Sequence, residues 1–246
     1  MTIATVEKAF TRLKAGEDRA FDEMASAVYA YQQAHNPVYG RYSHASAWAG
    51  WQAAPFLPVT AFKHRPVTTF PAEDAERVFE SSGTGRGVSS KHYVRKLALY
   101  EQAVTTHFEH VFGAGPFTLV AHLPHYSERA ERSSLVYMVD TLMRRYGDEA
   151  SGFFLDDHDV LHRACTFSEK QGTPLLLFGA AFGLLGLAEA GSHCLPPSAL
   201  VIETGGMKTF RRAVSRDELH RRLSAGLGVP SSQIYSEYGM CELLSQ

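Results

Sequence analysis

The chain has 246 residues, of which 45% are hydrophobic and 20% are charged, enough for one large domain or one and a half with a substantial core. Its net charge is -2 and it contains no long basic run, which disfavours nucleic acid and anionic membrane surfaces as partners. Cys165, Cys194 and Cys241 have no metal-ligand spacing. An odd number of cysteines without an export signal favours the reducing cytoplasm as the location of the protein.

The first third of the chain changes character near residue 35. Residues 5–34 have a helical pattern, and six apolar or aromatic positions are expected to form its buried face: Phe10, Leu13, Phe21, Met24, Val28 and Tyr31. Residues 35–72 are rich in proline, glycine and aromatic side chains, which predicts loops and short extended pieces.

Strands and helices then alternate. Strands are expected at residues 117–123, 152–155, 175–178, 199–203 and 233–236. Helices are expected between them, one after a cap at Ser133 or Ser134, one ending near Lys170, and one after a capping box at residues 215–218 that stops at Gly226 or Gly228. This alternation predicts an α/β fold with a mostly parallel sheet flanked by helices.

Residues 174–190 are the most apolar stretch of the chain. Glycines interrupt them and the stretch is short for a bilayer, so a buried strand followed by a buried helix is favoured over a membrane span.

A glycine-rich loop at residues 81–87 has the composition of a phosphate-binding loop. Its glycines allow backbone N–H groups to turn toward an anion, its hydroxyls add donors, and Arg86 and the following Lys91 add positive charge. The loop residues are Ser81, Ser82, Gly83, Thr84, Gly85, Arg86 and Gly87. No Gly-Lys-Ser/Thr follows, and residues 89–94 look extended, so the loop is expected between two strands as a flap over phosphates. A plain glycine-rich hairpin is the alternative.

Two further segments directly follow predicted strands. Gly205 and Gly206 come after the strand at 199–203, and the run Tyr238-Gly239-Met240-Cys241-Glu242 comes after the strand at 233–236. In parallel sheets ligands bind beyond the carboxyl ends of strands, so both segments are expected on the ligand side. The alternative for the second segment is a core tyrosine and a solvated glutamate.

In this order, the three segments resemble the adenylate-forming superfamily, which activates carboxylic acids with ATP. The sequence is most similar to its acyl-protein synthetase branch, the fatty-acid-activating component of luminescence systems. The similarity extends over nearly the whole chain, through residues 31–39, 57–63, 123–129, 133–139, 203–208 and 236–246.

The resemblance implies roles for these residues. Residues 81–87 would hold the β- and γ-phosphates of ATP, Gly205 and Gly206 would flank the adenine, and Tyr238 with Gly239 would pack on it. Glu242 would bind Mg²⁺, with Thr84 as a second metal contact and Lys91 as a catalytic cation. An acyl-adenylate would form and pass its acyl group to a protein or thiol acceptor, with an acyl reductase as a possible partner.

The sequence departs from the superfamily pattern in three respects. Cys241 stands where threonine is usual before the glutamate, and the phosphate loop reads Gly-Thr-Gly-Arg-Gly where Gly-Thr-Thr-Gly is usual. The ribose-binding aspartate, the hinge and the mobile C-terminal domain would lie beyond Gln246. Residues 1–246 are therefore expected to be an incomplete N-terminal adenylation domain that binds ATP weakly.

Several histidines have two interpretations. His122 and His125 bracket the end of a predicted strand and, with Tyr126, are candidates for the carboxylic acid site. His158 and His162 have a metal-binding spacing, but a polar helix N-terminus is the favoured interpretation. His107 and His110 are expected on a solvated helix face beside Glu109.

The sequence thus favours ATP-dependent activation of a fatty or aryl acid, with ATP and Mg²⁺ as cofactors. The alternative is a catalytically incomplete nucleotide- or partner-binding fragment. A dinucleotide-dependent oxidoreductase is disfavoured because no Gly-x-Gly-x-x-Gly opens a helix.

Overall fold

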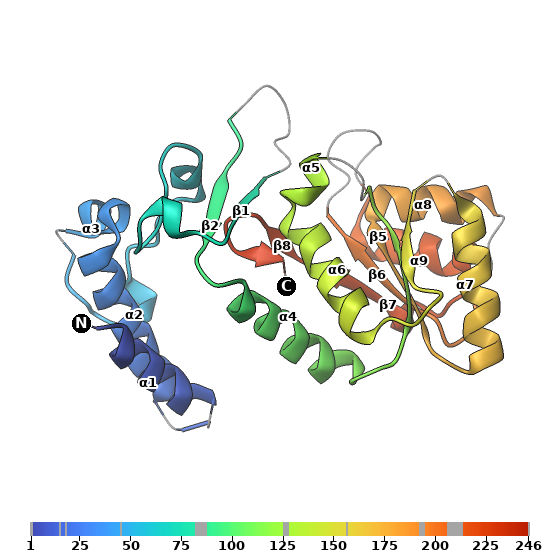
Figure 1. Ribbon diagram of the computed structural model, residues 1–246, viewed down its shortest axis with the longest axis horizontal. Helices are drawn as coiled ribbons and strands as arrows, with labels where there is room; N and C mark the ends of the chain where they lie inside the picture. Colours follow the sequence, from blue (N-terminus) through green and yellow to red (C-terminus); the bar gives the residue numbers. More distant parts are fainter. Residues whose placement is uncertain are drawn as a thin grey trace. The chain divides into compact units, whose positions relative to one another are not determined.

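The computed structural model divides the chain into two compact units, Met1–Leu97 and Ala98–Gln246 (Figure 1). The residues that it describes are 2–14, 16–17, 19–44, 46–81, 88–124, 128–155, 157–191, 195–205 and 214–245.

Three α-helices open the first unit: α1 (Ile3–Lys14), α2 (Ala20–His35) and α3 (Pro37–Ser43). Gly16 adopts a φ of 71° and separates α1 from α2, so the helical pattern predicted over residues 5–34 is interrupted. The Arg12 guanidinium bridges this break, because it pairs with Glu17 at 2.6 Å and also with Glu23 on α2.

The predicted buried face of this helix pair was wrong for its two phenylalanines. Phe10 and Phe21 are 50% and 53% exposed, whereas Ala9, Ala20 and Ala27 are buried. Small side chains therefore occupy buried positions of these two helices, whereas the two large rings do not. The other four predicted positions, Leu13, Met24, Val28 and Tyr31, are half-buried.

The segment predicted as loops contains one α-helix and three short 3₁₀ helices. Asn36 caps α3, since its side-chain oxygen accepts hydrogen bonds from the N–H groups of Val38 and Tyr39, both at 3.1 Å. Pro37 then supplies the first helical residue, where a missing N–H has no cost. The 3₁₀ helices are η1 (Trp51–Ala53), η2 (Val59–Lys63) and η3 (Ala72–Asp74).

An antiparallel hairpin follows, formed by β1 (Arg77–Glu80) and β2 (Lys91–Val94). The placement of the glycine-rich loop between two strands is confirmed by this pairing. Residues 82–87 themselves lie outside the described residues.

The second unit is a layered α/β structure built on five strands. In chain order it contains α4 (Leu97–Phe112, beginning at the last residue of the first unit), β3 (Thr118–His122), α5 (Glu128–Glu131), α6 (Ser134–Tyr146), β4 (Gly152–Phe154), α7 (His158–Gln171), β5 (Leu175–Ala180), α8 (Ala181–Ala190), β6 (Leu200–Thr204), α9 (Arg216–Leu227), η4 (Ser231–Gln233) and β7 (Ile234–Glu237). A small hairpin of β8 (Gly239–Met240) and β9 (Leu244–Ser245) completes it.

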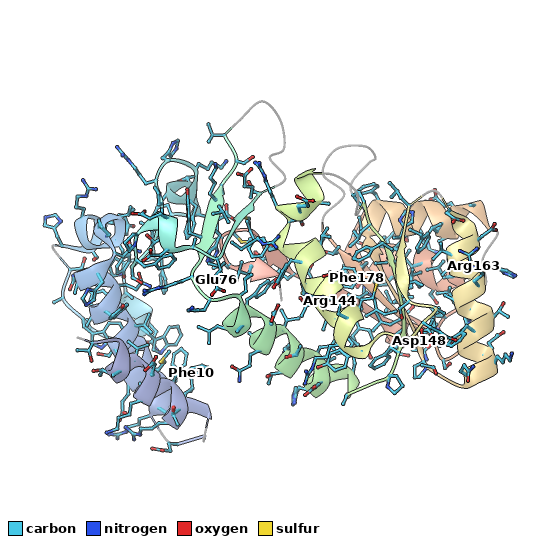
Figure 2. All side chains as sticks on the ribbon, viewed as in Figure 1. Phe10, Glu76, Arg144, Asp148, Arg163 and Phe178 are labelled. Atoms are coloured by element: carbon cyan, nitrogen blue, oxygen red, sulfur yellow. The ribbon has the colours of Figure 1, made fainter. Side chains whose placement is uncertain are left out.

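The five strands form one parallel sheet in the order β4-β3-β5-β6-β7. Helices cover both of its faces (Figure 1). On one face, Val120, Leu177 and Val201 belong to a buried cluster that continues into α7, α8 and α9. On the other, Phe108 of α4 stacks on Tyr146 of α6 at 5.1 Å. Among the side chains drawn in Figure 2, Phe178 lies inside this unit and is 2% exposed. The predicted α/β class is confirmed.

The predicted helix caps are confirmed as well. The Ser133 hydroxyl accepts the Val136 N–H at 3.3 Å, and the Ser215 hydroxyl accepts the Glu218 N–H at 3.2 Å. Of the two glycines proposed to end α9, the structure uses Gly228, whose φ of 75° suits a residue without a Cβ. The stretch 174–190 is a strand followed by a helix, as predicted. No described helix has the length and apolar character needed to cross a bilayer.

The chain changes the side of β3 on which it adds the next strand. From β3 the chain passes through α6 to β4 on one side, and then through α7 to β5 on the other. Ligands of open α/β sheets bind at the carboxyl ends of strands near such a reversal. A ligand site is therefore expected at the carboxyl ends of β3, β5, β6 and β7.

Candidate functional site

Gly205 and Tyr238 lie at the same edge of the sheet. β6 and β7 are neighbouring parallel strands that end at Thr204 and Glu237, which are partners in the ladder. Gly205 directly follows the first strand with a φ of 78°, and Tyr238 directly follows the second. Both segments therefore begin at the carboxyl edge of the sheet, directly after strands, as predicted. Gly206 lies outside the described residues.

Tyr238 is 70% exposed, so the interpretation of this residue as a core tyrosine was wrong. Its hydroxyl lies 3.2 Å from the Met240 sulfur, which holds the side chain along the chain that follows it. An exposed aromatic ring beside a strand end is suited to stacking on a flat base. The neighbouring Gly239 is also exposed and carries no side chain to obstruct such a ligand.

Glu242 lies in the turn of the β8–β9 hairpin, for which the sequence had predicted no secondary structure. The Leu243 N–H donates to the Met240 carbonyl at 3.0 Å, and Leu244 adopts a φ of 65° to close the turn. Strands of two residues have no periodic pattern, which is why they escaped prediction. Glu242 and Cys241 are both half-buried in this turn, and β9 packs against α6.

His122 ends β3, next to the point where the strand order reverses. Its Nε2 lies 3.1 Å from the Leu155 carbonyl oxygen, and its ring packs edge-on against Phe154 at 5.1 Å. A Cβ at Gly183 would lie 2.6 Å from Nδ1 of this ring, so the glycine makes room for the imidazole. The predicted position of His122 at the end of a strand is confirmed, whereas His125 and Tyr126 lie outside the described residues.

Ser81, the described residue of the candidate phosphate loop, and Lys91, the first residue of β2, lie at the base of that loop within the first unit. The Ser81 hydroxyl oxygen accepts the Ser90 N–H at 2.9 Å, which leaves its own O–H able to donate to an anion. The Lys91 ammonium pairs with Glu80 across the hairpin at 3.2 Å. The positive charge of Lys91 is thus already partly neutralised by a neighbouring carboxylate.

A polar cluster that sequence reasoning missed lies at the ends of β6 and β7, just before Gly205 and Tyr238. The Glu203 side chain is 8% exposed, and its Oε1 accepts a hydrogen bond from the Ser236 hydroxyl on the neighbouring strand. Nε2 of His220, on α9, lies 3.4 Å from the same carboxylate oxygen and 3.3 Å from the Ser236 oxygen. A carboxylate at the end of an otherwise apolar strand was the available signal, and His220 shares its helix face with Leu223 and Leu227.

Ser236, His220 and Glu203 have the residue types of a hydrolytic triad, but their side chains do not have the geometry of one. A relay needs one imidazole nitrogen to face the serine and the other to face the carboxylate. Here the same nitrogen, Nε2, faces both groups, and the serine hydroxyl donates directly to the carboxylate. The cluster is arranged to hold strands and helix together rather than to activate Ser236 as a nucleophile.

A second polar pair joins β6 and β7 one residue further along. The Thr204 hydroxyl donates to the Glu237 carboxylate, and these two residues are the last partners of the ladder. Because side chains alternate along a strand, this pair lies on the opposite face of the sheet from Glu203 and Ser236. The carboxyl ends of the two strands are therefore joined by side chains on both faces.

The pair His158 and His162, which has a metal-binding spacing, lies on α7 directly after a capping aspartate. Asp157 caps α7 by accepting the Asp159 N–H at 3.1 Å, which matches the polar helix N-terminus interpretation. Within the described part of the chain, no three His, Cys, Asp or Glu side chains form a group able to hold a metal ion. Asp156 and the side chain of His158 are not included in that part.

Glu109 lies on the exposed face of α4, as expected, and it also has a side-chain partner on α6. The Tyr146 hydroxyl donates to it at 2.6 Å, and burial together with this hydrogen bond raises the pKa of Tyr146. His107 and His110 are exposed on α4, as predicted.

Comparison with known proteins relates the fold to a ligase. No protein-family model matches the sequence, and no curated protein matches it. The structure is similar to that of a 2-hydroxyisobutyryl-CoA ligase solved with 2-HIB-AMP and CoA, with a TM-score of 0.61 and 16% sequence identity. The match covers 92% of this chain and 50% of that ligase, so the chain spans half the length of the ligase. The chain therefore shares the fold of the corresponding half of a CoA ligase.

Proposed function

We propose that this chain is the N-terminal adenylation domain of an enzyme that uses ATP to activate a carboxylic acid. One observation carries the proposal: Gly205 and the exposed Tyr238 follow neighbouring parallel strands of a sheet whose fold is shared with an acyl-CoA ligase. Two backbone segments at adjacent strand ends, one with a glycine and one with an aromatic ring, suit a flat base between them.

The described residues have the chemical groups that ATP and Mg²⁺ require. Tyr238 offers a stacking surface for adenine, and Gly205 offers a backbone without a side chain in the way. Glu242 offers a half-buried carboxylate, and Mg²⁺ in nucleotide sites is commonly held by one or two carboxylates together with the substrate phosphates. By the sequence resemblance, residues 81–87, including Thr84, are proposed to contact the phosphates; of these residues the structure describes Ser81 alone.

The proposed reaction has two balanced steps. A carboxylate oxygen of the acid attacks the α-phosphorus of ATP, the bond from that phosphorus to the bridging oxygen breaks, and pyrophosphate leaves. An acceptor nucleophile then attacks the acyl carbon, loses its proton to solvent, and releases AMP. The protein contributes mainly by positioning the reactants, and bound Mg²⁺ would neutralise charge on the phosphates.

The finer identity of the enzyme is proposed from the sequence resemblance. It favours the acyl-protein synthetase branch, a fatty or aryl acid as substrate, a protein or thiol as acceptor, an acyl reductase as partner, and the cytoplasm as location. His122, His125 and Tyr126 are proposed near the acid, because His122 ends β3 beside the reversal of strand order.

Acid-dependent pyrophosphate release by the complete protein tests the proposal. Fatty, aryl and short hydroxy acids would be supplied one at a time with ATP and Mg²⁺, with reactions lacking acid as controls. At least one acid class is expected to stimulate release. Nucleotide binding without release for any acid would instead support a catalytically incomplete nucleotide-binding fragment.

A further inference from the structure

The carboxyl ends of β6 and β7 are joined differently from the rest of these strands. Val201 and Ile234, which pair at the other end of the ladder, are both apolar and buried. The last two pairs are polar instead: Glu203 faces Ser236, and Thr204 faces Glu237. The change from apolar to polar pairing occurs where the two strands diverge into the Gly205 and Tyr238 segments.

We propose that the two polar pairs, with His220, are positioning residues that fix the separation between Gly205 and Tyr238 for nucleotide binding. Together they are called the strand-end clamp: Glu203, Thr204, His220, Ser236 and Glu237. The proposal deepens the proposed function and rests on it, because the clamp is assigned a role in binding the nucleotide of that same site.

The clamp acts where the backbone ladder can no longer hold the strands. Thr204 and Glu237 are the last ladder partners, so among the described residues the ladder does not extend to Gly205 and Tyr238. A hydroxyl donating to a carboxylate across the strands supplies a directional link at each of the last two positions. Apolar pairs at these positions would bury area but would not set a distance.

Burial makes the link on the α9 face strong. A carboxylate withdrawn from water is costly unless hydrogen-bond donors or a cation compensate it. Glu203 is 8% exposed and has Ser236 and His220 within reach on two different elements. Loss of either partner would leave the carboxylate less well compensated and would loosen β7 or α9 from β6.

Variants that remove or keep one hydroxyl test the clamp in the complete protein. Thr204→Val and Ser236→Ala remove the two donors, whereas Thr204→Ser and Ser236→Thr keep them. Each lost charge-assisted hydrogen bond is expected to raise the KM for ATP about tenfold, with a smaller effect on kcat. The hydroxyl-keeping variants are expected to recover most of the lost affinity.

Ser224→Ala is the matched control. Ser224 lies near the end of α9 and donates to the Val229 carbonyl at 2.6 Å, before β7 begins and at the opposite end from Tyr238. Its loss is expected to lower the melting temperature and leave the KM for ATP unchanged. Amide hydrogen exchange of residues 200–205 and 234–238 gives a readout that does not depend on activity, and it is expected to accelerate only in the clamp variants.

The outcomes separate the clamp from the proposed function. If the unsubstituted protein releases pyrophosphate and both donor-removing variants keep their KM, the clamp is wrong and the adenylation function stands. If Ser224→Ala raised the KM for ATP equally, the rise in the clamp variants would be due to a general loss of stability, and the clamp would also be wrong. If the unsubstituted protein releases no pyrophosphate with any acid, the proposed function fails and the positioning role fails with it. Ser236 is exposed, so Ser236→Ala remains measurable if Thr204→Val does not fold.

Discussion

The imidazole of His122 occupies the space that a side chain at position 183 would need. A Cβ built on Gly183 would lie 2.6 Å from Nδ1 and 2.8 Å from Cε1 of His122, closer than real atoms approach. The ring has little freedom to move away, because Nε2 is 3.1 Å from the Leu155 carbonyl and Phe154 packs against it. Gly183, in the first turn of α8, thus leaves the space that the ring of His122 occupies, and His122 is a candidate residue of the carboxylic acid site.

Gly183→Ala is therefore expected to destabilise the protein. Alanine in a helix is favoured over glycine by about 1 kcal/mol, but forcing a side chain into a filled space costs about 1–3 kcal/mol. A net loss of up to about 2 kcal/mol is expected from urea unfolding of the variant.

Gly186→Ala is the control on the same helix. A Cβ at position 186 would meet no atom within 4 Å, so this substitution is expected to be neutral or to stabilise by up to about 1 kcal/mol. In a His122→Ala background the ring is absent, and Gly183→Ala should no longer destabilise. A persistent loss in that background would show that His122 is not the cause.

The parallel sheet was predictable because its strands are buried runs bounded by clear stop signals. Leu175–Ala180 is apolar along its length, and Ser215 and Gly228 mark the two ends of α9 by their side-chain chemistry. The same local signals place Gly205 and Tyr238 after strands. A strand and its direction are enough to assign these residues to one edge of a sheet.

The first unit was less predictable because its packing depends on contacts between helices. Phe10 and Phe21 fit a helical apolar pattern, yet alanines occupy buried positions and the two rings are exposed. Hydrophobicity ranks side chains by their transfer from water, but the closeness of two helices is decided by side-chain size. Asn36 did carry a signal for α3, since asparagine before proline is a typical helix start.

The polar cluster at the strand ends was missed because its members are distant in sequence. Glu203, His220 and Ser236 lie on three elements, and only the register of β6 against β7 brings the first and last opposite each other. Sequence spacing predicts partners within one helix or strand, whereas register between strands depends on the whole sheet.

Glu76→Gln is expected to make the stability of the first unit less dependent on pH. The Glu76 carboxylate, labelled in Figure 2, accepts the Leu97 N–H at 2.8 Å and pairs with the Lys96 ammonium at 3.1 Å. The backbone hydrogen bond and then Lys96 hold the pKa of Glu76 below its ordinary value of 4.5. A lowered pKa means that the stabilisation is present above pH 4.5 and is lost as the pH falls through the lowered pKa.

The unfolding free energies of the wild type and the variant would be measured between pH 3 and pH 7. The difference between them should still be intact about one to two pH units below neutrality, and it should shrink on further acidification. Glu73→Gln, on the nearby η3 helix, is the control, because within the described residues Glu73 makes no recorded hydrogen bond or ion pair. A pH-independent difference for Glu76→Gln would contradict the prediction.

Cys241→Thr is expected to keep or increase acid-dependent pyrophosphate release. Cys241 is half-buried in the same turn as Glu242. Threonine is the usual residue at this position in the superfamily that the sequence resembles. A hydroxyl is a stronger hydrogen-bond donor and acceptor than a thiol. Pyrophosphate release and acyl transfer would be measured separately. Transfer lost while release continues would identify Cys241 as an acyl carrier instead.

Glu242→Gln gives the sharpest test of the adenylation site. Glutamine keeps the size of the side chain but removes the charge that a hard cation such as Mg²⁺ requires. Loss of charge compensation on the leaving pyrophosphate is expected to slow acid-dependent release by about a hundredfold or more. The rate would be measured over a Mg²⁺ titration, so that weakened metal affinity is separated from a slower chemical step.

The fold should survive this substitution. Glu242 lies in a hairpin turn and is half-buried, and such a change usually alters the unfolding free energy by about 0.5 kcal/mol or less. Glu149→Gln is the matched control: Glu149 is exposed in the turn before β4, at the amino end of the sheet, and its substitution should leave the rate unchanged. A near-wild-type rate for Glu242→Gln at saturating Mg²⁺ would remove Glu242 from the site. The ligand edge would then be defined by Gly205, Tyr238 and the strand-end clamp alone, with the metal held by other residues.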